Sequence, residues 1–463
     1  MDTHLAGSAS STRPRVLIVG CGFGGLAATR ALAGAPVDIT LVDRSNHHLF
    51  QPLLYQVATA GLSAPSIAAP IRHMLRRQRN VTVLMAEVSG IDKARRCVTL
   101  ADGQVLGYDF LILAAGATHS YFGRDEWAAH APGLKTLEDA FRLRARVLKA
   151  FEQAELAPDP ARQAALLSFV VIGGGPTGVE MAGTLAEIAH HTLRDEFRRI
   201  DPAGARVLLL EGSERVLQAL PPALSARAEQ QLQGLGVEVR TGCRVVGIDA
   251  EGVDVQPDGG GAPQRIPAHT VVWAAGVAAS PLGRLLEVPL DRAGRVQVDG
   301  LLGIPGHPEV FVIGDLAAAQ SQEADGRTRP VPGVSPAAKQ MGAHAAGSIL
   351  ARLRGREASL RPFRYRDYGA LATIGRKAAV ADLGWLQFSG YAAWLFWLFV
   401  HIYFLIGFRN RLVVLMDWAW AYWSFQRYAR VVVEPAPAAG GEEGTEGKEG
   451  VSPAPHRAAG RCG

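Results

Sequence analysis

Cysteine is scarce in this sequence, and the few cysteines lie far apart. The 463 residues contain four of them, at Cys21, Cys97, Cys243 and Cys462. Because no C-x-x-C spacing occurs, the pattern argues against a disulfide framework, a zinc site and a dithiol redox centre. Cys21 lies inside a glycine-rich loop, where we expect a small packed residue. His47 and His48 have no set of further ligands nearby, so we expect polar loop roles for them and no metal site.

A strong excess of charge is also missing. The formal net charge is +5 and the basic residues are spread along the chain, which argues against a nucleic-acid-binding arm and suits an anionic membrane surface better. Residues 1–14 contain no basic start followed by an apolar stretch, so we expect a short disordered lead and no signal peptide. Residues 433–463 are rich in Pro, Gly, Ala and Glu, which predicts a disordered tail. The hydrophobic content of 48% indicates two or three globular domains in between.

What the sequence does contain is two glycine-rich fingerprints. Residues 20–25 follow the apolar run 15–19, residues 173–178 follow the run 169–172, and each fingerprint opens a helical pattern. The glycines of such a loop allow a tight turn, a close approach of backbone to phosphate and close packing of helix on strand. The helix N-terminus then faces the pyrophosphate. Two such loops predict two dinucleotides held in one chain, with electron transfer between them.

An acidic residue ends the second strand of each predicted unit. Asp43 follows the strand 37–42, at the position where a carboxylate binds the ribose hydroxyls of an adenosine. Glu211 follows the strand 206–210, after a helix that we expect to run to about residue 199. A carboxylate there favours NADH over NADPH because it repels a 2′-phosphate. Arg215 lies close by in the sequence and is able to soften that preference.

Two strand ends are repeated between the units. The strand 110–113 runs into Ala114-Ala115-Gly116, and the strand 271–273 runs into Ala274-Ala275-Gly276. The pairing indicates duplicated nucleotide-binding units in which small residues let the chain pass close to a cofactor. Simple strand–loop packing is the alternative, and it stays open.

A third motif supports a flavin cofactor. The strand 309–313 leads into Gly314-Asp315, before an Ala-rich helix. A carboxylate at that place is able to bind a cofactor sugar or ribityl hydroxyl while the helix N-terminus faces phosphate. With the two fingerprints upstream, the pair indicates FAD.

Together these segments resemble the type II (non-proton-pumping) NADH:quinone oxidoreductases, a family of flavoproteins with two dinucleotide-binding domains. The resemblance covers about residues 14–430 and rests on residues 20–25, 46–55 (NHHLFQPLLY), 173–180, 312–315 and 335–340 (SPAAKQ). It implies an α/β fold with two Rossmann-like domains, the NADH domain inserted in the FAD domain, and C-terminal membrane-associating helices. The implied division is 1–14 lead, 15–135 first part of the FAD domain, 136–295 NADH domain, 296–350 second part of the FAD domain, 351–432 membrane-associating region and 433–463 tail.

The resemblance also implies the chemistry. Tightly but non-covalently bound FAD takes a hydride from NADH and passes two electrons to a membrane quinone, ubiquinone or menaquinone. The cofactor-binding residues expected from the motifs and the resemblance are Gly20, Gly22, Phe23, Gly24, Gly25, Asp43, Arg44, Gln51, Val88, Ala115, Gly116, Gly173, Gly175, Thr177, Gly178, Glu211, Gly276, Gly314, Asp315, Ala337 and Ala338.

Three residues are expected to act in catalysis. Glu180 matches the glutamate that the family places near the flavin, where a raised pKa would let it relay a proton. The alternative is an acid stabilised by the helix dipole. Lys339 and Gln340 are expected near flavin and quinone on a helix with Ser335 as N-cap, the alternative being an ordinary surface helix. Ser335-Pro336 stands where the family often has Ala-Gln, so part of the quinone contact must differ.

The C-terminal part is rich in aromatic residues. Residues 391–408 carry no formal charge, and as one helix they would approach the thickness of a bilayer core. A second apolar stretch, 412–425, contains Asp417. Helices lying in the membrane interface, a true span and a buried core helix are the three alternatives. Clustered tryptophans with basic flanks, together with the resemblance, favour the first. We therefore expect a peripheral enzyme of the inner (cytoplasmic) membrane that faces the cytoplasm, with homodimer formation left open.

Three other functions compete with this interpretation. A sulfide:quinone oxidoreductase would need reactive cysteines near the flavin, and the sequence offers no suitable set. A membrane-attached NADH-sensing flavoprotein that signals without turnover is not excluded by the motifs. A soluble ferredoxin or rubredoxin reductase would not need the tryptophan-rich C-terminus.

Overall fold

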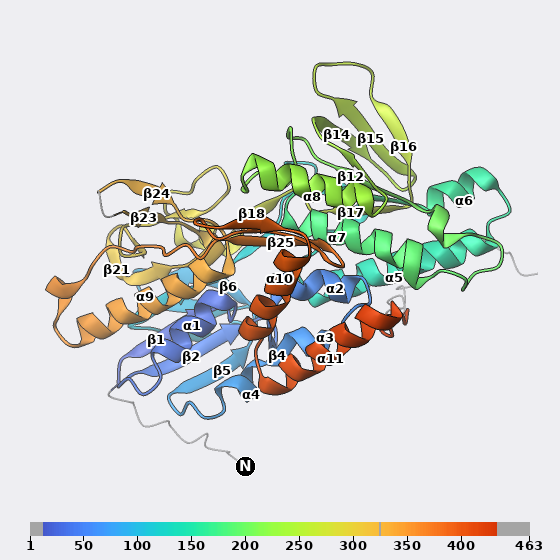
Figure 1. Ribbon diagram of the computed structural model, residues 1–463. Helices are drawn as coiled ribbons and strands as arrows, with labels where there is room; N and C mark the ends of the chain where they lie inside the picture. The colour runs from blue at the N-terminus through green and yellow to red at the C-terminus, as the bar shows by residue number, and fades with distance from the viewer. Residues whose placement is uncertain (1–12, 324–325, 433–463) are drawn as a thin grey trace, which may run out of the picture. The chain divides into compact units, whose positions relative to one another are not determined.

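The computed structural model describes residues 13–323 and 326–432, and its elements are labelled in Figure 1. Residues 1–12 and 433–463 lie outside the described residues, and with them most of the expected lead, the whole expected tail and Cys462. The described residues form two large, mainly parallel sheets, several small sheets of two or three strands and a C-terminal pair of helices.

The first sheet has six strands, and all but the edge strand β20 run parallel. Their apolar side chains are largely buried on both faces, as parallel strands covered by helices require. The order is β20 (Gly303–Ile304), β21 (His307–Val312), β9 (Phe110–Leu113), β1 (Arg15–Val19), β2 (Asp38–Asp43) and β5 (Val81–Met85). Helices α1 (Phe23–Ala31) and α9 (Ser335–Leu353) pack against each other.

The second sheet has four parallel strands. Its order is β13 (Val237–Arg240), β12 (Arg206–Leu210), β11 (Ser168–Ile172) and β17 (Thr270–Trp273). In the chain these strands lie between β9 and β21, which are neighbours in the first sheet, so the second unit is inserted in the first. The predicted fold class is confirmed. In each sheet the chain adds strands first on one side of its first strand and then on the other. This change of direction opens a crevice at the carboxyl ends of two neighbouring strands, β1 and β9 in the first sheet and β11 and β17 in the second.

The duplication extends to smaller elements. A three-stranded antiparallel sheet precedes the last strand of each repeat. One is β6 (Val88–Asp92), β7 (Cys97–Leu100) and β8 (Val105–Gly107), and the other is β14 (Cys243–Ile248), β15 (Gly252–Pro257) and β16 (Gln264–Pro267). Strands β10 (Ala117–His119) and β18 (Val277–Ala279), which follow the two repeated strand ends, pair with each other and join the units.

The remaining elements connect or cover these sheets. They are β3 (His47–Leu49), α2 (Leu54–Ala58), α3 (Ala64–Ile67), β4 (Ala68–Pro70), α4 (Ile71–Leu75), α5 (Leu137–Leu156), α6 (Pro160–Leu166), α8 (Pro222–Gly234), β19 (Val296–Gln297), β22 (Ala317–Ala318), β23 (Gln320–Gln322) and β24 (Thr328–Pro330).

The helix that follows the second glycine loop is shorter than the sequence predicts. Helix α7 covers Pro176–Glu187, a π-helical turn covers Ile188–Thr192, and no helix reaches residue 199. The prediction fails because Asp195 has φ +64°, which a right-handed helix does not contain. Glu187, at the junction, is instead bound by residues from the C-terminal part of the chain.

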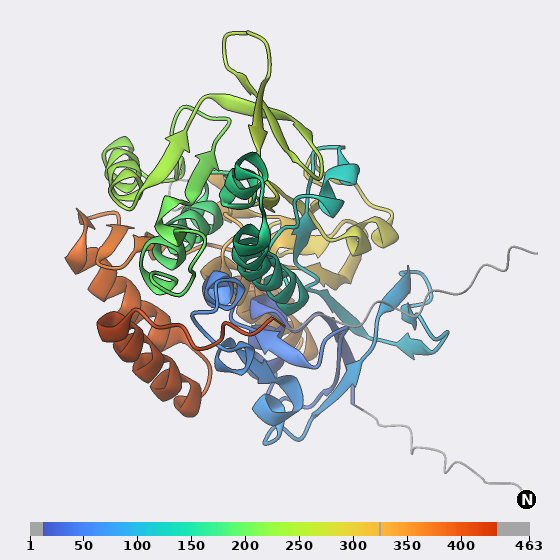
Figure 2. The same cartoon turned by 90° about the vertical axis from the view of Figure 1, so that its right-hand side faces the viewer.

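The C-terminal region consists of a small sheet and two helices. The sheet is β25 (Ala370–Gly375), β26 (Ala378–Asp382) and β27 (Gln387–Ser389), and the helices are α10 (Tyr391–Phe404) and α11 (Phe408–Ser424). Figures 1 and 2 show both helices, in red, on one flank of the protein, where α11 lies against α3 and α10 against β26.

The expectation of one helix over 391–408 is wrong. The chain leaves the helix at Leu405, which is extended, and turns at Gly407 with φ +88°. Arg411 holds the turn, because its Nε donates to the carbonyl oxygen of Leu405 at 2.8 Å. Helix α10, with 14 residues, rises only ~21 Å. Within residues 13–323 and 326–432, every helix is too short or too polar to cross a bilayer.

Candidate functional site

The first glycine loop turns sharply between β1 and α1. Gly20 has φ +97°, and a Cβ atom there would lie 2.5 Å from the carbonyl oxygen of Ala114, so the turn requires glycine. A Cβ atom at Gly25 would collide with the carbonyl oxygen of Gly20, which shows how closely α1 packs on the loop. Gly22, in contrast, has no protein atom within 4 Å of its Cβ position. The open space lies at the carboxyl end of β1, where a pyrophosphate binds in such units.

The second loop repeats this geometry. Gly173 has φ +107°, and its Cβ position lies 2.5 Å from Cα of Ala275. A Cβ atom at Gly178 would collide with the carbonyl oxygen of Gly173, whereas Gly175 faces open space. Helices α1 and α7 both start from a glycine N-cap, without a side-chain cap and without an acid in the first turn. Their first N–H groups are therefore left for an anionic ligand.

Both predicted acids are tied to their loops by matching hydrogen bonds. The backbone N–H of Cys21 donates to Asp43 Oδ2 at 2.6 Å, and that of Ser45 donates to Oδ1 at 2.7 Å. In the second unit, the N–H of Gly174 donates to Glu211 Oε2 at 2.5 Å, and that of Ser213 donates to Oε1 at 2.8 Å. These bonds fix each carboxylate and leave further oxygen lone pairs for ribose hydroxyls.

Arg215 is engaged elsewhere. Its Nη1 donates to the carbonyl oxygen of Leu220 at 2.7 Å, and its Nη2 donates to that of Gln218 at 3.1 Å. The guanidinium is thus held by the loop that follows β12. This arrangement does not support the expectation that Arg215 softens the nucleotide preference set by Glu211.

The first unit carries a third element at its crevice. Gly314 turns with φ +71°, and its N–H contacts Met341 Sδ of α9 at 3.1 Å. A Cβ atom at Gly342 would collide with the carbonyl oxygen of Gly24, so α9 lies directly on the glycine loop. The first loop, residues 314–315 and the start of α9, with Ala337 and Ala338, therefore form one surface. The N-cap of α9 is Val334, not Ser335 as expected, and Ser335 makes no cap hydrogen bond because it already belongs to the first turn.

The other predicted contact residues are more spread out. Ala115 lies beside the first loop, with its Cα 3.3 Å from the Cβ position of Gly20. Val88 is buried at the start of β6, so its backbone is the part that is able to face a ligand. Gly276 is packed against Ser120 and Phe122, where the two units join. Phe23, Gly116, Arg44, Gln51 and Thr177 are half-buried or exposed near their loops, and their contacts with cofactor stay predictions.

The donor set of each unit fits a dinucleotide. Open space above Gly22 and Gly175, uncapped helix N-termini and oriented carboxylates supply a phosphate site and a ribose site twice. Only the first crevice is flanked by Asp315 and the start of α9, within the part of the chain that the structure describes. This difference fits FAD in the first unit and NADH in the second.

Glu180 lies on α7, one turn beyond the second glycine loop. Its side chain is half-buried, and burial of the carboxyl raises its pKa well above the usual value, although a hydrogen bond from the backbone of Thr373 opposes the shift. The pKa of the Tyr55 phenol, on α2, is also raised, in part because the Glu180 carboxyl lies nearby. The raised pKa favours the protonated form of Glu180, from which a proton relay starts.

Lys339 and Gln340 have different surroundings. Lys339 Nζ lies 5.1 Å from the ring centroid of Phe23 and 4.8 Å from that of Phe404, and burial lowers its pKa. It bridges the first glycine loop and α10. Gln340 is bound at both ends of its amide by the backbone of Arg366, with two bonds of 2.9 Å. Catalytic roles for both residues stay predictions.

A pocket that the sequence did not predict lies between α2, α7 and β25 on one side and α10 and α11 on the other. We call it the aromatic pocket. Its aromatic lining residues are Tyr55, Trp394, Trp397, Trp418, Tyr422 and Phe425, and its charged ones are Glu187, Arg376 and Arg427. The cluster of tryptophans was the available signal, but membrane attachment explained that cluster equally well.

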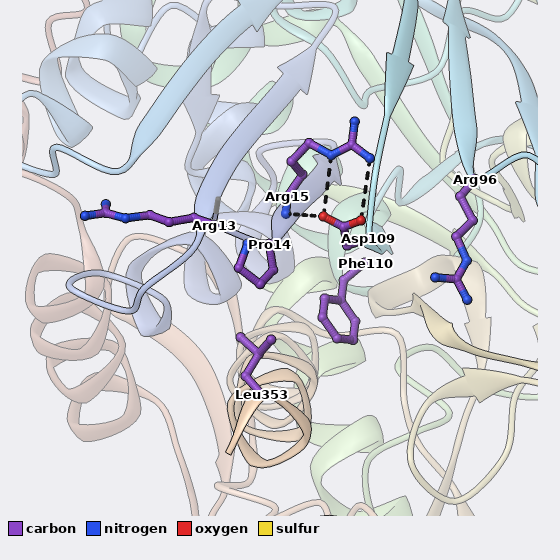
Figure 3. A pocket seen from close by; sticks show the side chains of 7 residues that line it. All are labelled: Arg13, Pro14, Arg15, Arg96, Asp109, Phe110 and Leu353. Carbon is purple, nitrogen blue, oxygen red and sulfur yellow. Dashed lines mark hydrogen bonds and ion pairs between the residues drawn. The ribbon is translucent and has the colours of Figure 1, made fainter. Parts of the chain in front are cut away.

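A second pocket lies at the amino ends of the central strands of the first sheet (Figure 3). It is lined by Arg15 and Phe110, the first residues of β1 and β9, whereas ligands of parallel sheets bind at the carboxyl ends. Its Asp109 already accepts hydrogen bonds from the Arg15 backbone at 2.7 Å and from the Arg15 guanidinium. Figure 3 shows Arg13 and Arg96 on opposite sides of this pair, so the arginines do not converge on one point. We therefore place no nucleotide there.

The described cysteines are separate thiols. Cys21 and Cys243 are buried, and burial raises the pKa of Cys21 to about 12. A thiol with such a pKa is a poor nucleophile at neutral pH. The geometry thus gives no support to the sulfide-oxidising alternative.

Fold and site together define a flavin- and pyridine-nucleotide-dependent reductase with two dinucleotide sites. The pyridine nucleotide-disulphide oxidoreductase family matches residues 14–342, and the NDH2 C-terminal domain family matches residues 368–423. The chain belongs to the type II NADH:quinone oxidoreductase family.

The relatives and a solved structure agree with this assignment. The type II NADH:quinone oxidoreductase Ndh of Mycobacterium tuberculosis is 49% identical over 426 residues, with 90% of this chain and 89% of the relative covered. NdhA of the same organism is 47% identical over 421 residues, with 89% and 87% covered. The structure of NDH2 from Plasmodium falciparum with NADH has a TM-score of 0.82 at 20% identity, and covers 91% of this chain and 100% of that one. At that identity, the structural likeness concerns the fold.

Proposed function

We propose that this protein is an FAD-dependent NADH:quinone oxidoreductase that does not pump protons. The observation that carries the proposal is the pair of matching glycine loops, each with its own bound carboxylate, in a chain that belongs to this family. When bound, FAD supplies the hydride and electron chemistry between the two substrates. The overall reaction is NADH + H⁺ + quinone → NAD⁺ + quinol.

Different residues of the chain bind the two nucleotides and supply the proton in this proposal. Glu211 and the start of α7 hold NADH, while Asp43, the start of α1 and the segment 314–315 hold FAD. Glu180, whose raised pKa favours the protonated carboxyl, would give up a proton as the quinone becomes a quinol. The aromatic pocket, between the nucleotide units and the C-terminal helices, supplies a place for the quinone ring.

A turnover experiment tests this function. The detergent-purified protein should carry a flavin spectrum, and NADH should be oxidised faster than NADPH once a short-chain quinone is added. Absence of flavin, or NADH oxidation that does not respond to quinone, would refute the proposal. Steady quinone-dependent turnover also separates the enzyme from a sensor that binds NADH without turnover.

We further propose that α10 and α11 attach the protein to the cytoplasmic face of the inner membrane. Their exposed apolar residues form a stripe on each helix, which we call the outer apolar face: Tyr391, Leu395, Phe399, Tyr403, Phe404, Phe408, Leu412, Leu415, Met416, Trp420 and Trp423. Along α10 the first four follow a spacing of four residues, the spacing of one helix face. Arg409 and Arg411 lie in the first turn of α11, where they suit anionic headgroups.

Vesicle flotation tests the attachment. A double change of Phe399 and Phe408 to Glu places two charges in the outer apolar face, where these side chains are 66% and 81% exposed. It should release the protein from anionic vesicles. Phe141→Glu, an exposed change on α5, is the control and should float like the wild type. Unchanged flotation of the double variant would contradict the proposal.

A further inference from the structure

Three side chains in the aromatic pocket form a continuous chain of hydrogen bonds. Trp418 Nε1 on α11 donates to Gln56 Oε1 at 2.7 Å, and Gln56 Nε2 donates to the Tyr55 hydroxyl oxygen at 2.9 Å. An indole N–H only donates, so Gln56 has to present its carbonyl oxygen to Trp418 and its amino group to Tyr55. The C-terminal helix thereby fixes the orientation of an amide that belongs to the FAD-binding domain.

The orientation of the amide determines the role of Tyr55. Because the phenol oxygen accepts from Gln56, the phenol's own proton is left to donate. No hydrogen bond within residues 13–323 and 326–432 uses that proton, although Tyr55 is only 5% exposed. A buried donor without an acceptor is costly, so an acceptor supplied by a bound molecule would stabilise this arrangement. Burial and the nearby Glu180 raise the pKa of Tyr55 well above the usual value, which keeps the donor protonated.

The charges of the pocket indicate a neutral occupant. Glu187 and Arg427 pair with each other at 3.0 Å. The Arg376 guanidinium donates to the carbonyl oxygens of Tyr422 and Ala421, at 2.5 and 2.6 Å. The cations are therefore already satisfied by the protein, and the indole and phenol rings suit a flat apolar molecule with a hydrogen-bond acceptor.

We propose that Tyr55 donates a hydrogen bond to a carbonyl oxygen of the quinone in the aromatic pocket, with Gln56 and Trp418 as positioning residues. The inference rests on the proposed quinone reductase function and adds the residue that recognises the quinone oxygen. It also means that the acceptor site is complete only with α11 in place. Trp418 fixes the orientation of the Gln56 amide, and that amide in turn fixes the direction of the Tyr55 hydroxyl proton.

Steady-state kinetics of the flavin-loaded enzyme test the proposal with two electron acceptors, a short-chain quinone and ferricyanide. Tyr55→Phe removes only the hydroxyl and should raise the KM for quinone roughly tenfold, the worth of one hydrogen bond in a buried site. The ratio of quinone to ferricyanide activity should fall with it. Tyr368→Phe, which removes an exposed phenol hydroxyl elsewhere in the chain, is the matched control.

The positioning role needs its own variants. Trp418→Phe keeps a ring but frees the Gln56 amide, so it should raise the KM for quinone severalfold. In the Tyr55→Phe background the same change should raise the KM for quinone by a smaller factor than it does alone, because part of its effect passes through the phenol. Gln56→Glu replaces the amino donor by an acceptor and draws the phenol proton away from the pocket. It should therefore imitate Tyr55→Phe although the hydroxyl is kept.

The outcomes separate this inference from the proposed function. A wild type without quinone-dependent turnover overturns the function itself. A wild type that turns over, with an unchanged quinone KM in Tyr55→Phe and Gln56→Glu, overturns the role of Tyr55. Independent, additive effects of Tyr55→Phe and Trp418→Phe overturn the positioning role of Trp418.

Discussion

Glu187 and Arg427, which are 240 residues apart in the chain, form an ion pair of 3.0 Å in which each side chain is only 12% exposed. Arg427 also donates to the carbonyl oxygen of Thr59 at 3.1 Å. The other Glu187 oxygen accepts from the backbone N–H of Arg376 at 2.5 Å. The end of helix α7, the segment after α2 and the chain beyond α11 are thus held together at the edge of the aromatic pocket.

Removing one partner of this pair should destabilise the fold strongly. Glu187→Gln leaves the buried Arg427 without its counter-charge, and we expect a loss of about 3 kcal/mol in the free energy of unfolding. The double variant Glu187→Gln with Arg427→Met should recover part of that loss, since no charge then remains unpaired. Urea unfolding of the three proteins measures both effects. A double variant less stable than Glu187→Gln alone would contradict the explanation.

Gly22 and Gly175 both face open space, and substituting them should affect different cofactors. Gly175→Ala meets no protein atom, so the fold should tolerate it, but its methyl group occupies the space expected for the NADH pyrophosphate. We expect at least a tenfold rise in the KM for NADH (about 1.4 kcal/mol) with unchanged flavin content. Gly22→Ala should have the reverse signature and lower the flavin content of the purified protein. A loss of flavin in Gly175→Ala would show that the loops are assigned to the wrong cofactors.

Glu211 should set the preference for NADH. Glu211→Arg replaces the carboxylate that we expect to bind the ribose by a group that pairs with a 2′-phosphate, so the ratio of kcat/KM for NADPH to that for NADH should rise by tenfold or more. Some activity with NADH will be lost in any case, because Glu211 also accepts the N–H of Gly174. Glu214→Arg makes the same change of charge at an exposed position three residues away and serves as control. An unchanged cofactor ratio would refute the role of Glu211.

The parts of the site that were predictable are those encoded locally. Gly20 and Gly25 are needed for a turn and a packing contact within one strand–loop–helix unit, and Asp43 follows the neighbouring strand at a regular distance. Such features leave a pattern in the sequence. Because the pattern occurs twice, it predicted two nucleotide units, whereas the nesting of one unit in the other was implied by the resemblance to the family.

The aromatic pocket was not predictable in the same way. Gln56 and Trp418 lie 362 residues apart, and neither carries a local signal for the other. The same holds for Glu187 and Arg427, whose pairing depends on where the chain beyond α11 returns to α7. Residues 391–408 carry no formal charge and are almost entirely apolar, and this composition conceals the turn at Gly407. Tertiary contacts decided these features.

The raised pKa of Glu180 makes stability depend on pH in a definite direction. Below the ordinary value of 4.5, the carboxyl is protonated in both the folded and the unfolded chain and contributes no difference. As the pH rises above 4.5, the unfolded chain ionises freely while the folded protein keeps the proton, so the unfolded state gains stability relative to the folded one. This penalty increases with pH until the folded-state pKa is reached.

Glu180→Gln isolates that contribution, because an amide does not ionise. The stability of the variant relative to the wild type should therefore be larger at pH 8 than at pH 5, while quinone-dependent turnover falls through loss of the proton donor. Thermal unfolding of both proteins over this range measures the first effect, with Glu152→Gln, an exposed change on α5, as control. If the difference in unfolding temperature between Glu180→Gln and the wild type is the same at pH 5 and at pH 8, Glu180 is ionised in the folded protein. In that case the carboxyl has no proton to give at neutral pH, and the proton must reach the quinone by another route.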